Sequence, residues 1–174
     1  RHSFPTRRSS DLFKTPAVHE SMIFWEGTGE VHVTFQGRKP TQYGIEFKDM
    51  ACGIAHIMLM IELAEGKDKD ALKEYRDAVG ATTACTLRLT APYAGTGRCG
   101  VWDAWFQNCN TAEWVKDVHG LDSIGAIKTG HKGYPKALIL EKLGEERGSH
   151  VCYKLTVELD TGATTFYASG FRDK

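Results

Sequence analysis

The sequence lacks any long apolar run. Its longest, GIAHIMLMIELA, is interrupted by His56 and Glu62, and it falls short of the roughly 20 residues that a membrane helix needs. The basic first residues are not followed by the apolar segment of a secretory signal. We therefore expect no membrane span and no export signal.

Recognisable cysteine patterns are also lacking. The five cysteines are odd in number, and no two of them form a Cys-x-x-Cys pair. This argues against a disulfide framework and against a zinc ribbon, and it favours a reducing compartment. A chain of 174 residues is long enough for one core, so we expect one domain.

The whole sequence also has a formal net charge of zero, although this balance of acidic and basic residues depends on the first twelve residues. RHSFPTRRSSDL reads as a sequencing-adapter oligonucleotide translated in frame, and we interpret residues 1–12 as an artefactual leader. Leaving them out lowers Lys plus Arg from 22 to 19 and Asp plus Glu from 22 to 21, a net charge of −2. Bulk basicity therefore gives no support for nucleic-acid binding by residues 13–174.

The first half of the sequence has the patterns of strands and then of helices. Residues 17–25 and 31–37 are apolar and rich in β-branched or aromatic side chains, which predicts two strands. Residues 42–63 predict an antiparallel hairpin that turns between Met50 and Gly53. Residues 67–79 carry apolar side chains on one helical face and predict an amphipathic helix. A second helix is expected over 82–90.

The second half alternates strands and helices. Residues 98–105 predict a strand, and a helix follows in which Asn110 caps, Glu113 completes a capping box and Gly120 ends the last turn. Beyond it we expect a strand over 122–129, a short helix over 134–144, and a hairpin over 150–171 that turns at Asp160–Gly162.

This order predicts an α/β fold built on a mixed sheet. Antiparallel strands come first, and a strand-helix-strand unit follows, which is typical of a sheet whose later half is parallel. Ligand sites in such sheets form beyond the carboxyl ends of adjacent central strands. Asp103 lies at such an end, directly before the loop into a helix, and is therefore a candidate site residue.

Five short motifs occur in an order that resembles one family. They are His19-Glu20-Ser21-Met22, Gly37-Arg38-Lys39-Pro40 with Gly44, Asp103-Ala104-Trp105-Phe106, Gly125 with Lys128, Lys132 and Pro135, and the closing GFRDK. Their order and spacing over residues 18–174 resemble the piggyBac-like transposases and their domesticated derivatives. The resemblance implies a ribonuclease-H-like catalytic core with flanking helices. Such a core cuts and joins DNA with two Mg²⁺ or Mn²⁺ ions held by Asp or Glu side chains.

The resemblance also implies roles for particular residues. Asp103 matches the second catalytic acid and would be a metal ligand, whereas His19 stands at the position of the first catalytic Asp. Imidazole is a poor ligand for Mg²⁺ but suits Mn²⁺ or Zn²⁺. In the family the third acid lies beyond the motif that ends this sequence. We therefore expect a fragment that does not catalyse the reaction as it stands.

Implied partners are the DNA of transposon ends and a second copy of the chain, and the implied compartment is the nucleus. The basic turn of Lys128, His131 and Lys132 is a candidate for contacts with DNA phosphates, and so are Arg38 and Lys39. Each has a plainer interpretation as part of a solvated loop or turn.

Plainer interpretations exist for the two central residues and for the whole chain. Asp103 would commonly be a turn-capping acid after a strand, and His19 a polar residue left in a decayed site. The chain as a whole is a transposase fragment, a domesticated module that binds DNA or protein, or an unrelated α/β binding domain. These alternatives stay open from sequence alone.

Overall fold

A computed structural model describes residues 15–29, 32–128 and 130–173. They form two compact units, which we call the sheet unit (residues 15–126) and the hairpin unit (residues 127–173) and describe one at a time. The expected leader at residues 1–12 lies outside the described residues. No helix of the described residues is long and apolar enough to cross a membrane.

The sheet unit is built on one mixed sheet. Its strands run in the order β2-β3-β1-β5-β6, and β4 pairs with β3. The pairs among β1 to β4 are antiparallel, whereas β1–β5 and β5–β6 are parallel, which confirms the predicted fold class. The bounds are β1 Pro16–Phe24, β2 Val33–Phe35, β3 Tyr43–Cys52, β4 Met58–Leu63, β5 Cys99–Trp102 and β6 Asp122–Gly125.

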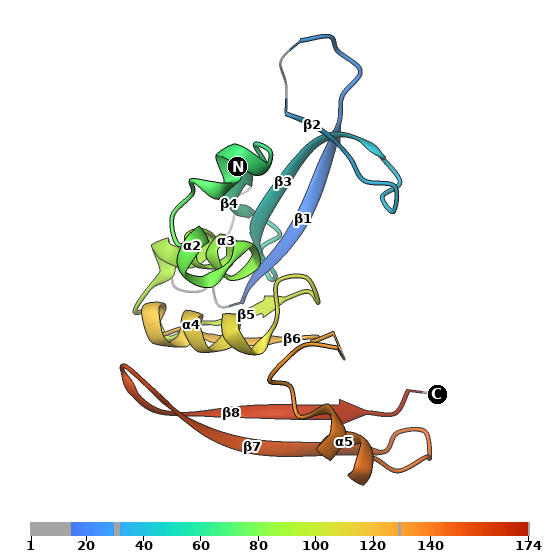
Figure 1. Cartoon of the computed structure of the whole chain (residues 1–174), viewed down its shortest axis with the longest axis vertical. Helices are drawn as coiled ribbons and strands as arrows, with labels where there is room; N and C mark the ends of the chain where they lie inside the picture. Colours follow the sequence, from blue (N-terminus) through green and yellow to red (C-terminus); the bar gives the residue numbers. More distant parts are fainter. Residues whose placement is uncertain (1–14, 30–31, 129, 174) are drawn as a thin grey trace, which may run out of the picture. The chain divides into compact units, whose positions relative to one another are not determined.

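Helices cover one face of this sheet. Val18, Met50 and Trp102 point to that face and form a core cluster with Leu87 of α3 and Val115 of α4. Figure 1 shows β1 and β3 running side by side, with these helices next to the sheet. The helices are α1 Lys67–Ala71, α2 Arg76–Val79, α3 Ala81–Thr90, the 3₁₀ turn η1 Ala91–Tyr93, and α4 Cys109–His119.

The opposite face of the sheet, which we call the open face, exposes several of its side chains. Period-two alternation along the strands directs Ile23, Val101 and Ile124 to this face, and their side chains are 56%, 38% and 62% exposed. The same alternation puts His19 on this face. Polar and apolar side chains are therefore mixed there.

Two local expectations were wrong. The predicted helix over 67–79 is broken into α1 and α2, because Tyr75 adopts a left-handed backbone (φ 65°). Leu72, expected on the buried helical face, is 87% exposed. The predicted turn between Met50 and Gly53 comes later, because β3 continues to Cys52, whose N–H donates to Ile57 O at 2.8 Å.

The start of α4 also differs from the expectation. Asn108 rather than Asn110 caps the helix, and its side chain accepts a hydrogen bond from the Thr111 N–H at 2.9 Å. The predicted end is confirmed, since Gly120 has the left-handed conformation (φ 63°) that ends many helices.

The hairpin unit contains α5 (Lys136–Lys142) and the antiparallel strands β7 (His150–Leu159) and β8 (Gly162–Phe171). The predicted turn is confirmed, because Leu159 pairs with Gly162. Ile139 of α5 is 4% exposed and lies against Gly170, where an added Cβ would come within 2.2 Å of its Cγ2. Helix α5 thus covers one end of one face of this two-stranded ribbon.

Candidate catalytic face of the sheet

The open face of the sheet brings the two central candidate residues together. Strands β1 and β5 are parallel, and Val18 is the register partner of Trp102. The next residue of β1 is His19, and the residue that directly follows β5 is Asp103. The register therefore places the backbones of His19 and Asp103 at neighbouring positions, at the carboxyl end of β5.

Asp103 shapes the turn that follows β5. Its Oδ1 accepts hydrogen bonds from the backbone N–H groups of Trp105 at 2.7 Å and Phe106 at 3.2 Å. This is the turn-capping role of the plainer interpretation. No hydrogen bond from a described residue reaches Oδ2, and Asp103 is exposed. One carboxylate oxygen is thus available to a ligand while the other holds the turn.

Asp49 is a polar residue of this face that the sequence reasoning missed. It is the register partner of His19 on β3 and is 4% exposed. Its carboxylate accepts a hydrogen bond from the Ser21 hydroxyl on β1. Nothing in the local pattern of residues 43–52 distinguishes Asp49 from the other charged residues there. Only the pairing of β1 with β3 reveals it.

The donor set on this face does not fit a pair of Mg²⁺ ions. Magnesium takes oxygen ligands and near-octahedral geometry. At the strand position next to Asp103, however, His19 offers an imidazole nitrogen rather than a carboxylate oxygen. Asp49 is engaged by Ser21. In the part of the chain that the structure describes, no three His, Cys, Asp or Glu side chains are grouped so as to hold a metal ion.

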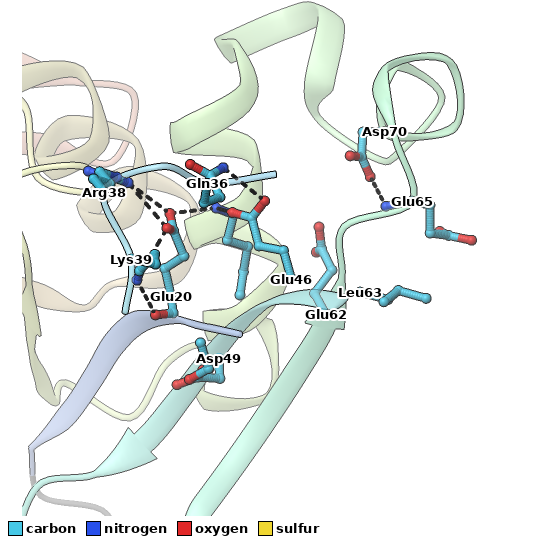
Figure 2. Close-up of polar contacts among 12 residues, drawn as sticks. Glu20, Gln36, Arg38, Lys39, Glu46, Asp49, Glu62, Leu63, Glu65 and Asp70 are labelled. Atoms are coloured by element: carbon cyan, nitrogen blue, oxygen red, sulfur yellow. Dashed lines mark hydrogen bonds and ion pairs between the residues drawn. The ribbon is translucent and has the colours of Figure 1, made fainter. Parts of the chain in front are cut away.

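The covered face of the sheet holds a charged network around Glu20, the residue after His19. Glu20 is 4% exposed. Its carboxylate accepts hydrogen bonds from Arg38 Nη2 at 3.2 Å and Lys48 Nζ at 2.8 Å, and its carbonyl oxygen accepts from Lys39 Nζ at 2.9 Å. Figure 2 shows Arg38 and Lys39 gathered at Glu20.

The charges of this network shift the pKa values of Glu20 and Lys48. Burial by itself would raise the pKa of Glu20, but the hydrogen bond and charge of Lys48, together with Lys39, outweigh burial, so this pKa lies below its ordinary value. Burial would likewise lower the pKa of Lys48, but Glu20 and Glu46 outweigh it and raise that pKa. Glu20 and Lys48 are therefore both ionised at neutral pH. Lys48 also lies over the ring of Trp105, with Nζ 4.3 Å from the ring centroid.

The network changes what is expected of Arg38 and Lys39. Their side chains are 62% and 23% exposed, and both pair with Glu20. Arg38 and Lys39 therefore form ion pairs within the fold, and these pairs connect the loop after β2 with β1.

A cavity of about 480 Å³ adjoins the same network. Arg88 of α3 and Glu62 of β4 form a two-point ion pair at its wall, with both N–O distances at 2.7 Å. The charged side chains of its wall balance in sign: acids Glu20, Glu46, Glu62 and Asp70, and bases Arg38, Lys48, Arg76 and Arg88. The cavity therefore favours neither an anion nor a cation.

The basic turn belongs to the hairpin unit. Lys128, His131 and Lys132 are exposed, and the His131 N–H donates to Lys128 O at 2.9 Å. Thr129, within the same predicted turn, lies outside the described residues. The turn leaves both lysine side chains open to solvent.

Comparison with known proteins decides the family. A family model described as Transposase IS4 matches residues 9–159. The chain belongs to this transposase family. The transposase match covers both His19 and Asp103 as well as most of the hairpin unit.

One solved structure shares the fold of this transposase domain. It is a cryo-EM structure of a piggyBac transposase synaptic complex with hairpin DNA, with a TM-score of 0.67 and 16% sequence identity. The match covers 88% of this chain and 32% of that one, so the chain spans about a third of the length of that transposase. Among curated proteins no match is found.

Proposed function

We propose that this domain derives from the catalytic core of a piggyBac-like DNA transposase and that, with His19 at the position of the first acid, it does not cut DNA by itself. The transposase family and the fold support the first part. The observation that carries the second is that the position next to Asp103, on the neighbouring strand β1, is occupied by the imidazole of His19, with Asp103 itself directly after β5. In the ancestral reaction, acids at such positions would hold the divalent ions for cleavage and strand transfer.

The role of Asp103 can be tested by restoring the missing carboxylate. We expect His19→Asp to bind Mg²⁺ and Mn²⁺ more tightly than the parent chain in calorimetric titrations, because two adjacent carboxylates suit a hard cation. Adding Asp103→Ala to His19→Asp should remove that gain. His56→Asp, which adds a carboxylate on an exposed loop, and Asp160→Ala, at the hairpin turn, are the matched controls.

Two results would contradict the proposal. If Asp103→Ala leaves the metal affinity of His19→Asp unchanged, Asp103 is a turn residue alone. If the parent chain nicks supercoiled DNA in Mn²⁺ and Asp103→Ala abolishes the nicking, the domain is an active nuclease and His19 is a working ligand.

A second candidate function, a domesticated module that binds DNA without cutting it, is favoured by the charge distribution. Residues 13–126 contain 11 Lys or Arg and 15 Asp or Glu, whereas residues 127–174 contain 8 and 6. The two parts thus have net charges of −4 and +2. A polyanion would therefore contact the hairpin unit first, and nuclear DNA and a dimeric assembly remain part of this proposal.

DNA binding through the basic turn has a simple test. The double variant Lys128→Ala/Lys132→Ala should weaken binding of duplex DNA, and the slope of log affinity against log salt should fall by about 1 for each of these lysines that binds a phosphate. Lys142→Ala is the control, because this lysine is paired with Glu141. An unchanged slope would leave the turn as a solvated loop.

A further inference from the structure

We propose that the outer face of the β7–β8 ribbon binds single-stranded DNA by stacking bases on Tyr167 and Phe171. The proposal rests on the proposed function for the class of ligand, DNA, and assigns it to a surface that the basic turn and the His19–Asp103 pair do not include. Side chains of this outer face come from alternate residues: His150, Cys152, Lys154, Thr156, Glu158, Ala163, Thr165, Tyr167, Ser169 and Phe171.

Contacts of α5 identify which face of the ribbon is outer. Ile139 lies against Gly170, and Val151 is the register partner of Gly170. The Tyr153 hydroxyl donates to Leu138 O at 3.1 Å. Helix α5 therefore lies on the face of Val151, Tyr153 and Gly170, and alternation directs the intervening residues to the other side.

The outer face exposes two aromatic rings. Tyr167 is 67% exposed and Phe171 64% exposed. They stand four residues apart on β8, which is about 14 Å at the usual rise of a strand. That distance leaves room for an extended strand of nucleotides to stack one base on each ring with others between them. Base stacking on aromatic side chains needs unpaired bases, which favours a single strand over a duplex.

A side chain that carries or can take up a positive charge stands beside each ring. Lys154 is the register partner of Tyr167, and His150 is the register partner of Phe171. Cross-strand partners have Cβ atoms about 5 Å apart, so a phosphate next to a stacked base would lie within reach of these side chains. The outer face carries an acid only at Glu158, next to the hairpin turn. Lys154 stands beside Tyr167 and away from Glu158, and residues 127–174 as a whole have a net charge of +2, so the unit that carries the face attracts a polyanion.

The test measures the fluorescence anisotropy of labelled oligonucleotides with the full chain. The probes are an oligo(dT) strand and a duplex, each of about 20 nucleotides per strand, which exceeds the usual site size of about 4–16 nucleotides. We expect Tyr167→Ala and Phe171→Ala each to weaken oligo(dT) binding by about 5- to 150-fold. Tyr167→Phe should bind as the parent does. Leu140→Ala, at a 52% exposed position of α5 outside this face, is the control.

A reporter variant covers the case in which an alanine variant does not fold. Tyr167→Trp retains a stacking ring, and its added fluorescence should be quenched when oligo(dT) binds. Absence of this quenching at saturating oligo(dT) would overturn the proposal. Parent-like oligo(dT) affinity of both folded alanine variants would overturn it too.

Failure of this proposal differs from failure of the proposed function. If only Lys128→Ala/Lys132→Ala weakens DNA binding, the ribbon is excluded as the surface but the domain still binds DNA. If no probe binds at all, the ribbon proposal is overturned, whereas the metal titrations of His19→Asp still decide the catalytic ancestry independently.

Discussion

The sheet unit and the hairpin unit are held together in different ways. The sheet unit buries Leu87, Trp102 and Phe106 to 2% exposure or less within one cluster. Within the described hairpin unit, Ile139 is the one large apolar side chain that is buried. An isolated two-stranded hairpin is marginally stable in water. Within the hairpin unit the ribbon is supported by the packing of Ile139 and by hydrogen bonds such as that from the Tyr153 hydroxyl to Leu138 O.

Charge is used differently in the two units as well. In the sheet unit, Glu20 and Lys48 pair while largely shielded from water. In the hairpin unit, Glu141 and Lys142 pair at the surface with both side chains more than 60% exposed, where an ion pair contributes little. The sheet unit therefore holds paired charges in a shielded environment, whereas the hairpin unit leaves its paired charges in contact with solvent.

The largest effect is expected from the core of the sheet unit. Leu87→Ala should lower the free energy of unfolding by about 3 to 5 kcal/mol, because it removes a fully buried side chain and leaves a cavity. Urea unfolding followed by tryptophan fluorescence measures it, since all four tryptophans lie in residues 13–126. Leu72→Ala, at an 87% exposed position, should cost less than about 0.5 kcal/mol. Equal losses would show that α3 is not packed as described.

The charged network should give the next largest effect. Glu20→Gln removes one of the two carboxylates that pair with Lys48 and leaves Glu46 as the other, and we expect a loss of about 2 kcal/mol in the same unfolding experiment. Glu26→Gln, at an exposed position, is the control. A loss as small as that of the control would mean that the network contributes no net stability.

The Glu20 contribution should depend on pH. Its pKa in the folded state lies below the ordinary value of 4.5. The stabilisation is therefore present above that value and is lost as pH falls through the folded-state pKa. We expect the parent chain and Glu20→Gln to converge in stability in acid. Parallel stability curves from neutral to acid pH would contradict this.

Removing the contact between α5 and the β7–β8 ribbon tests whether the hairpin unit can lose stability while the stability of the sheet unit stays unchanged. Ile139→Ala should remove about 2 kcal/mol of local stability, which lowers the hydrogen-exchange protection of β7 and β8 about 30-fold. Peptides from residues 15–126 should exchange as before. Leu140→Ala, at a 52% exposed position on the same helix, should change neither. Faster exchange in both units would break the comparison drawn above.

The smallest effect concerns helix caps, and it sharpens the contrast between α4 and α5. Helix α4 has a side-chain cap at Asn108, whereas α5 begins after Pro135 without one. Asn108→Ala should cost about 1 kcal/mol. Asn110→Ala should cost less, because Asn110 makes only long contacts of 3.4 Å with Val79 O and Thr83 Oγ1. The reverse order of losses would mean that Asn110 is the cap, as the sequence suggested.

Short sequence patterns predicted the structure correctly where the conformation of a segment depends mainly on its own residues. The strand over residues 17–25, the hairpin turning at Asp160–Gly162 and the helix end at Gly120 were all predicted, because β-branched residues, turn residues and a left-handed glycine act within a few positions. The signals failed at residues 67–79, where Tyr75 interrupts a pattern that reads as one helix. Tertiary packing outweighs helix propensity there.

The sequence by itself determined the mixed sheet, its order of strands and helices, and the likeness to a transposase core, because these follow from periodicity and short motifs. Only the tertiary structure decided three features: the residue after β5, Asp103, follows the register partner of Val18; Asp49 is the buried register partner of His19 on β3; and Glu20 pairs with Arg38 and Lys39. The physical reason is register. A shift of one residue in strand pairing would turn every side chain to the other face, and no local pattern specifies which residues of distant strands pair.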